Sequence, residues 1–231
     1  MYENFQQPSS ESKEQRLKRM LGFRIFPKRT PEEKLALLGS EERLRSLDAI
    51  TTTTYPLSKK EIKKGAVLEI TERNLLPVEL LTEHPLVYIG SGTDIEYPLA
   101  LGGRDIRMID PILSDERAKA ELIEKIRQLI KEDQKIGDGQ KLGFLFDFGN
   151  GKEEVSVELV EKPYSPEDAE GYVIPDNVGL IVLYAAQSPG GRVAVDENMK
   201  SKLVEGGAIL EETTIIKPGK NGEENIIELG E

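Results

Sequence analysis

Residues 86–94 read LVYIGSGTD, an apolar run that ends in a loop with two glycines. A short, continuous apolar run of this kind is typical of a buried β-strand. Two glycines allow backbone N–H groups to approach a ligand closely at the start of a helix. Asp110 follows Gly90 by twenty residues and closes the next apolar run, where an acid can accept hydrogen bonds from a ribose. This layout predicts a loop that binds a nucleotide-type cofactor.

The segments around this loop alternate between strand and helix patterns. Residues 95–101 predict a helix that Gly102 stops, residues 106–110 a second strand, and residues 114–130 a helix with apolar positions at a 3.6-residue period. Strand, loop, helix, strand and helix form the unit that builds a parallel sheet. Residues 178–186 are apolar throughout, so we expect a strand in the middle of that sheet.

Two further patterns follow the first two strands. Runs of alternating apolar residues flank the turn at residues 149–151 (GNG), which predicts an inserted β-hairpin. Residues 196–204 predict a short helix that Gly206 and Gly207 stop, and residues 208–210 open another strand. The chain is therefore expected to be an α/β protein.

The first 85 residues lie outside the alternating pattern. We expect residues 1–14 to be disordered, residues 15–85 to form a helical cap or lead-in region, and residues 86–231 to form the main domain. Thr30 is followed by a proline and, three residues on, by a glutamate, which together predict a helix start. Ser40 and Ser58 are candidate caps of further short helices.

Composition excludes several functional classes. The chain has 42 acidic and 31 basic residues, and its net charge of −11 argues against duplex nucleic acid or an anionic membrane as the main partner. It has no cysteine and a single histidine, His84, which argues against thiolate catalysis and against a metal site. No apolar run is long enough to span a bilayer, and the first residues lack the apolar core of a secretory signal. We expect a cytoplasmic protein and leave its oligomeric state open.

Four features taken together resemble one known family. The glycine loop, Asp110, the buried strand at 178–186 and the segment LVEGGAIL at residues 203–210 resemble the class I S-adenosylmethionine-dependent methyltransferase fold. In that family a helix that ends in a Leu-x-x-Gly-Gly turn typically feeds directly into a strand. The likeness covers about residues 86–214. It implies a Rossmann-like, mostly parallel sheet with flanking helices, and S-adenosylmethionine bound across the carboxyl ends of the strands.

The resemblance also implies a cofactor site. Its residues in this chain are Gly90, Ser91, Gly92, Thr93, Asp94 and Asp110. The loop backbone faces the amino-acid part of the methyl donor, and Asp110 faces the ribose hydroxyls. Tyr88 stands where the family often has an acid, and Asp94 stands where it often has a third glycine. Asp94 either contacts the amino group of the donor or caps the helix that follows.

Three functions remain open on this evidence. The first is a methyltransferase that acts on a small molecule or another unidentified substrate. The second is a methyltransferase-like module that serves in binding or as a scaffold without catalysis. The third, a nicotinamide-dependent oxidoreductase, is disfavoured because Ile95 stands where the dinucleotide fingerprint needs its last glycine.

Two departures bear on the substrate and on the edge of the sheet. Residues 185–189 read AAQSP rather than the Asn/Asp-Pro-Pro-aromatic tetrapeptide of amino-group methyltransferases, which argues against methylation of a nucleobase or glutamine nitrogen. After residue 214 only seventeen residues remain, so we expect the last antiparallel hairpin of the family to be shortened or absent. The sequence identifies no catalytic residue.

Overall fold

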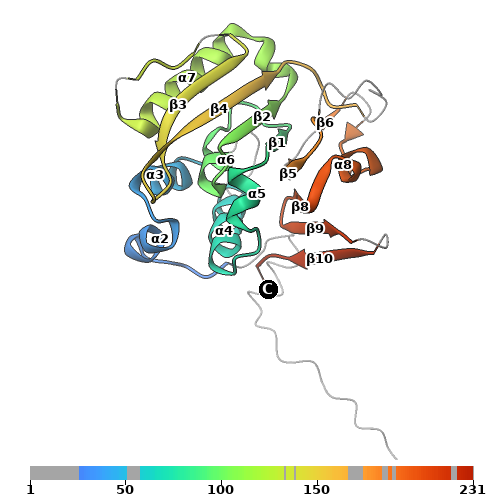
Figure 1. The fold of residues 1–231 in the computed structure, drawn as a ribbon. Helices are drawn as coiled ribbons and strands as arrows, with labels where there is room; N and C mark the ends of the chain where they lie inside the picture. Colours follow the sequence, from blue (N-terminus) through green and yellow to red (C-terminus); the bar gives the residue numbers. More distant parts are fainter. Residues whose placement is uncertain are drawn as a thin grey trace, which may run out of the picture.

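A single eight-stranded sheet organises the chain, with its strands in the order β10-β9-β8-β5-β1-β2-β4-β3 (Figure 1). The strands are β1 (Leu86–Ile89), β2 (Asp105–Ile109), β3 (Lys141–Asp147), β4 (Lys152–Val160), β5 (Val178–Leu183), β8 (Leu203–Glu211), β9 (Thr214–Pro218) and β10 (Glu224–Glu228). The short strands β6 (Gln187–Ser188) and β7 (Gly191–Arg192) pair separately. The computed structural model describes residues 26–50, 58–132, 134–137, 139–165, 174–183, 187–188, 191–219 and 223–230.

The five inner strands, in the order β4-β2-β1-β5-β8, are parallel, and β3, β9 and β10 are antiparallel to their neighbours. The predicted α/β fold with a mostly parallel sheet is therefore confirmed. All four residues of β1 pair with β2 on one side and with β5 on the other, and Ile89 lies opposite both Ile109 and Leu183. After β1 and β2 the chain forms the edge strand β3 and then β4, which lies between β3 and β2. It then crosses to β5, on the other side of β1.

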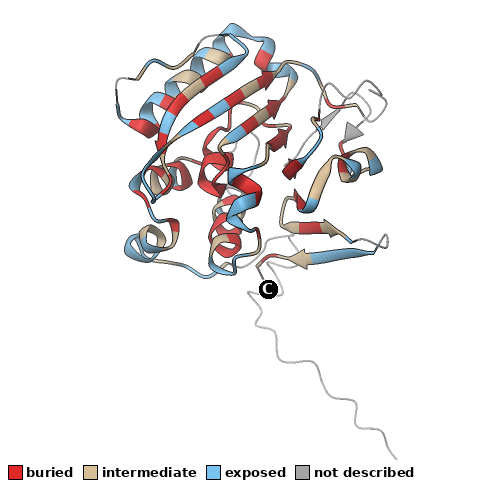
Figure 2. Ribbon diagram, in the orientation of Figure 1, coloured by how far each residue is buried: buried red, intermediate tan, exposed pale blue. Residues whose placement is uncertain are grey.

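Almost all of the described helices lie on one face of the sheet. They are α2 (Pro31–Leu38), α3 (Glu41–Ala49), α4 (Ser58–Glu72), α5 (Val78–Thr82), α6 (Glu96–Leu101), the 3-10 helix η1 (Pro111–Ser114), α7 (Glu116–Ile130) and α8 (Glu197–Ser201). Leu86 and Tyr88 of β1 join one core cluster with residues of α3, α4, α6 and α7, whereas Val87 and Ile89 join a second cluster on the opposite face with Met199 of α8. Figure 2 shows the buried residues along the inner strands and along α4 and α6.

The N-terminal helices begin as the capping residues predict. Thr30 forms a capping box with Glu33 at the start of α2, and the Ser40 hydroxyl accepts the Arg43 N–H at the start of α3. The turn predicted after Ser58 is a longer helix, since α4 continues to Glu72. These helices pack into the same core cluster as the sheet. The boundary between residues 85 and 86 stays a prediction. Residues 1–14, which are expected to be disordered, and residues 15–25, the first part of the expected cap region 15–85, lie outside the described residues.

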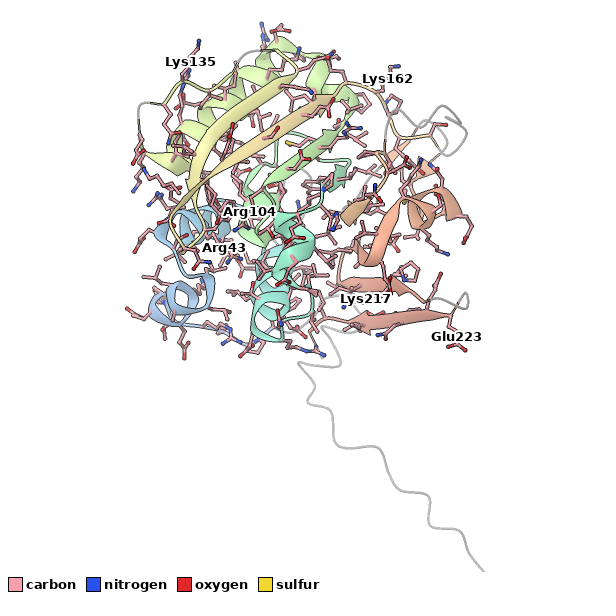
Figure 3. The ribbon with its side chains drawn as sticks, in the orientation of Figure 1. Arg43, Arg104, Lys135, Lys162, Lys217 and Glu223 are labelled. Carbon is pink, nitrogen blue, oxygen red and sulfur yellow. The ribbon has the colours of Figure 1, made fainter. Side chains whose placement is uncertain are left out.

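A half-buried arginine connects these helices. Arg43 of α3 donates to Leu38 O at 2.9 Å and to Ala100 O at 2.8 Å, so one guanidinium satisfies carbonyl groups at the ends of α2 and α6. Burial lowers the pKa of Arg43 to about 10, and the neighbouring charge of Arg104 adds to this effect. Figure 3 shows the two arginines close together beside α3. Arg104 also stacks over the ring of Phe148, 3.7 Å from its centroid.

Two predicted elements take a different form in the structure. The hairpin is not an insertion, because its second strand β4 pairs in parallel with β2 and so belongs to the main sheet. The expected helix at residues 196–204 ends at Ser201, and Gly206 and Gly207 lie within β8. The reason is strand pairing: Val178 N–H donates to Lys202 O at 2.9 Å, so the chain is already paired with β5 at that point. A Cβ at Gly207 would lie 3.0 Å from Val178 O, so this close approach favours glycine.

The end of the sheet also corrects the expectation. The last antiparallel hairpin is present, because β9 pairs with β8 and β10 pairs with β9 over five residues. Lys217 of β9 donates to Leu75 O at 2.7 Å and so joins this edge to the chain before α5. None of the described helices is long and apolar enough to cross a membrane.

Candidate functional site

The glycine loop follows β1 at the carboxyl edge of the parallel strands. Gly90 N–H donates to Ile109 O at 2.9 Å, which continues the pairing with β2 for one residue before the chain turns. Gly90 and Gly92 have φ of +72° and +54°, in the left-handed region that side chains disfavour. The two glycines therefore make this turn possible, as their spacing predicts.

Gly92 and Asp110 lie in direct contact. Gly92 N–H donates to Asp110 Oδ2 at 2.8 Å, and Ile112 N–H donates to Asp110 Oδ1 at 2.9 Å. Asp110 is half-buried and begins η1. A Cβ built on Gly92 would meet nothing within 4 Å, so the outer side of the loop is open. The structure thus brings together the two predicted parts of the site at the ends of neighbouring strands.

Ser91 and Thr93 direct their side chains into the protein. Both residues are buried, and the Ser91 hydroxyl donates to Gly92 O at 3.3 Å. The Thr93 hydroxyl donates to Glu121 Oε1 at 2.7 Å, while Lys125 of α7 donates to the Thr93 carbonyl at 3.2 Å. These contacts fix the loop on α7. They leave the backbone at Gly92 as the part of the loop that faces open space.

Asp94 forms a buried ion pair with the N-terminal helices. Lys63 Nζ of α4 lies 2.5 Å from Asp94 Oδ2, and the Tyr88 hydroxyl donates to the same oxygen at 3.1 Å. Tyr97 N–H, in the first turn of α6, donates to Asp94 Oδ1 at 3.3 Å, while Ile95 holds the N-cap position of that helix. Both oxygens of Asp94 thus have protein donors. Tyr88, which replaces the acid common in the family, supplies one of them.

Glu96 extends this buried network towards α7. It is 3% exposed, and its Oε1 lies 3.6 Å from Lys125 Nζ. Its Oε2 has no hydrogen-bond donor among the described residues. Burial raises the pKa of Glu96 to about 7, and the nearby charge of Asp94 raises it further, against the opposing effect of Lys125. Glu96, two residues after Asp94, is therefore a carboxyl group with a pKa close to neutral pH.

The sequence interpretation missed Lys63, Glu96 and Lys125. The two lysines have a signal in the pattern: Lys63 precedes Val67 and Ile70 at helical spacing, and Lys125 follows Leu122 by three residues. Both lysines thus lie at the border of an apolar stripe, where a charged residue needs a buried partner. Their partners come from distant parts of the chain and could not be read from spacing alone.

The single histidine of the chain, His84, lies away from the loop. His84 precedes β1 and so lies at the opposite edge of the sheet from Gly90. The Tyr164 hydroxyl donates to Asp196 Oδ2 at 2.7 Å, and burial raises the pKa of this tyrosine. Tyr172, Tyr184 and the side chain of Arg192 lie outside the described part of the structure. Within the described part, no group of three or more His, Asp or Glu residues could hold a metal ion.

Comparison with known proteins gives no relative on which to base a function. No protein-family model matches the chain, and no curated protein is significantly similar to it. What the loop binds is therefore inferred from its geometry.

Proposed function

We propose that this protein binds S-adenosylmethionine at the loop of residues 90–94 and at Asp110, and transfers its methyl group to a small-molecule acceptor. The observation that carries the proposal is the hydrogen bond from Gly92 N–H to Asp110 Oδ2, at 2.8 Å. It joins a glycine turn and an acid that the sequence separates by eighteen residues. A nucleotide ligand needs both groups side by side, one for close backbone approach and one for the ribose.

The position of the contact in the sheet supports the same proposal. Parallel α/β sheets bind ligands outside the carboxyl ends of their strands, at the point where the strand order reverses. In this sheet the order reverses at β1, which lies between β2 and β5. The loop that follows β1 is therefore at the place where a cofactor is expected.

Asp110 retains the capacity to bind two hydroxyl groups. Each carboxylate oxygen can accept two hydrogen bonds, and each of the two oxygens accepts one from a backbone N–H. The remaining lone pairs can accept the 2′ and 3′ hydroxyls of a ribose. The two N–H donors also fix the orientation of the carboxylate before a ligand arrives, which reduces the cost of binding.

Asp94 takes a positioning role in this proposal. Its pairing with Lys63 anchors the loop to α4, so the amino-acid part of the donor is bound by the loop backbone around Gly92. Methyl transfer makes limited demands on the protein, because the sulfonium of the donor carries the electrophilic carbon. The acceptor attacks that carbon, the carbon–sulfur bond breaks, and the sulfur leaves as a thioether. The main task of the site is to align the two reactants.

The second candidate function is a methyltransferase-like module without catalysis. The burial of Tyr88 and Asp94 in a network of their own favours it, because neither is then available to the donor. The two candidates differ in a measurable way: a catalytic module both binds the donor and transfers its methyl group. A scaffold module binds it weakly or not at all.

The proposal is tested by calorimetric titration with S-adenosylhomocysteine, using two matched variants. Gly92→Asn places a side chain in the open space over the loop, and asparagine tolerates the left-handed backbone there. Gly206→Asn is the control, since Gly206 is also left-handed and open but lies near the amino end of β8. We expect binding by the wild type and by Gly206→Asn, and none by Gly92→Asn. Equal binding by both variants would exclude the loop as the site.

A further inference from the structure

A groove lies between α3 and α7. Its volume is about 360 Å³, within the size range of small-molecule sites. The α3 wall comes from one face of that helix, where Leu44, Asp48 and their neighbours recur at intervals of three and four residues. The α7 wall is formed by Lys125, Gln128 and Leu129, and Glu96 of α6 completes the groove.

The walls combine apolar surface with an excess of negative charge. Leu44, Ala49 and Leu129 contribute apolar contact area, on which a hydrocarbon chain can pack. The ionisable residues of the lining are Glu41, Arg45, Asp48, Glu96 and Lys125. With every group charged, three acids face two bases. One positive charge on a ligand would therefore balance the lining.

The two basic residues of the groove are already engaged. Arg45 Nε donates to Leu129 O at 2.8 Å, at the end of α7. Lys125 lies 3.2 Å from Glu121 and also donates to the carbonyl and hydroxyl oxygens of Thr93. By contrast, Glu96 Oε2 is buried and has no donor among the described residues. The unsatisfied group in this groove is thus an acceptor, and a buried acceptor without a donor is costly.

We propose that this groove is a second ligand site, which binds a small organic cation with an alkyl chain and an ammonium or guanidinium head. The head donates to Glu96 Oε2, and the chain packs on Leu44, Ala49 and Leu129. Charge-assisted hydrogen bonds of this kind are about twice as strong as neutral ones. Lys125 connects this groove to Thr93 of the glycine loop, but the proposed cation contacts none of the loop residues.

The protonation of Glu96 makes binding sensitive to pH. Below about pH 7 its carboxyl group is protonated and no longer attracts a cation. The charged groups around it are Asp94 from the loop with its partner Lys63 from α4, Lys125 and Glu121 from α7, and Arg45, Asp48 and Glu41 from α3. Affinity for a permanently charged ligand is therefore expected to rise between pH 6 and pH 8.

The test is isothermal titration of the full chain with n-butylguanidinium, which stays charged over this pH range, and with n-pentanol as a neutral probe of similar size. Glu96→Gln keeps the shape of the side chain and removes its charge. Ala49→Leu fills the groove without touching Glu96. Glu116→Gln is the matched control, because the Glu116 side chain is 86% exposed on the same helix as Lys125. Circular dichroism verifies that each variant is folded.

We expect the guanidinium to bind the wild type and Glu116→Gln alike, with roughly tenfold or greater loss in Glu96→Gln and Ala49→Leu. We also expect weaker binding at pH 6 than at pH 8 in the wild type and in Glu116→Gln, and no such difference in Glu96→Gln. No binding to the wild type would overturn the proposal, and so would equal affinity for pentanol or undiminished binding by Glu96→Gln. Undiminished binding by Ala49→Leu would place the cation outside this groove and overturn the proposal as well.

Discussion

Gly92 N–H donates to Asp110 Oδ2 across 2.8 Å, between the loop after β1 and the end of β2. This contact holds an acid and an open stretch of backbone at one edge of the sheet. It is also the geometric basis for the proposed binding of S-adenosylmethionine.

Replacing Asp110 by alanine is expected to weaken binding of S-adenosylhomocysteine by about 1–3 kcal/mol, the contribution of a hydrogen bond to a charged group. The loss also removes the acceptor for Gly92 N–H and Ile112 N–H, so stability falls as well. Calorimetry well below the melting temperature separates the two effects. Asp176→Asn is the control, since Asp176 is exposed and precedes β5 at the other edge of the sheet. Unchanged affinity in Asp110→Ala would remove Asp110 from the site.

Lys63→Met is expected to destabilise the protein by about 3–5 kcal/mol, because it leaves the charge of Asp94 buried without its partner. The double variant Lys63→Met, Asp94→Asn removes both charges and should recover part of this loss. Urea unfolding of the two single variants and the double variant gives the coupling energy. Additive effects would show that the pair does not interact in solution.

Glu96 should make stability depend on pH. Its pKa is raised from 4.5 to about 7 in the folded state, so between these values the folded protein holds a proton that the unfolded chain has released. The free energy of unfolding therefore falls as pH rises from about 4.5 to about 7, by up to about 3 kcal/mol from this group. At lower pH this penalty is absent.

Glu96→Gln isolates that contribution. The variant carries no ionisable group at this position, so it should gain stability relative to the wild type between pH 5 and pH 8. Urea unfolding at both pH values measures the difference, and Glu116→Gln serves as the control at an exposed glutamate. A difference between wild type and Glu96→Gln that does not change with pH would contradict the raised pKa.

Arg43→Met should cost about 2–4 kcal/mol of unfolding free energy. The substitution keeps much of the side-chain volume but leaves Leu38 O and Ala100 O without their donor. Arg127→Met is the matched control on α7, where the side chain is 59% exposed and pairs with Glu124 of the same helix. If chemical denaturation gave the same loss of unfolding free energy for both variants, the hydrogen bonds of Arg43 would make no contribution of their own to stability.

Local patterns in the sequence predicted most elements of the fold. Continuous or alternating apolar runs predicted β1, β2, β3, β4 and β5, and capping residues predicted the starts of α2 and α3. The place of β4 in the main sheet was not predicted, because pairing between strands is a long-range choice that alternation within one strand does not encode. Gly206 and Gly207 were misinterpreted as a helix stop, since a glycine pair also permits the close approach of two strands.

In the candidate site, too, local patterns predict some contacts, and others depend on long-range packing. The spacing of Gly90, Gly92 and Asp110 predicted their approach, because strand ends in a parallel sheet share one edge. The partner of Asp94 was not predicted: Lys63 lies on a helix thirty-one residues earlier, and only the packing of α4 brings it there. Buried ion pairs depend on tertiary structure in this way, and sequence patterns indicate at most that a charge lies on an apolar face.

The most direct test of the central claim is the melting temperature of the wild-type protein with S-adenosylmethionine, S-adenosylhomocysteine or NAD at saturating concentration. A ligand at about 100 times its dissociation constant adds about 2.7 kcal/mol, which should raise the melting temperature by roughly 5–10 °C for a chain of this size. The proposal predicts this rise with both adenosyl ligands and none with NAD. No rise with either adenosyl ligand, or a rise with NAD alone, would contradict it.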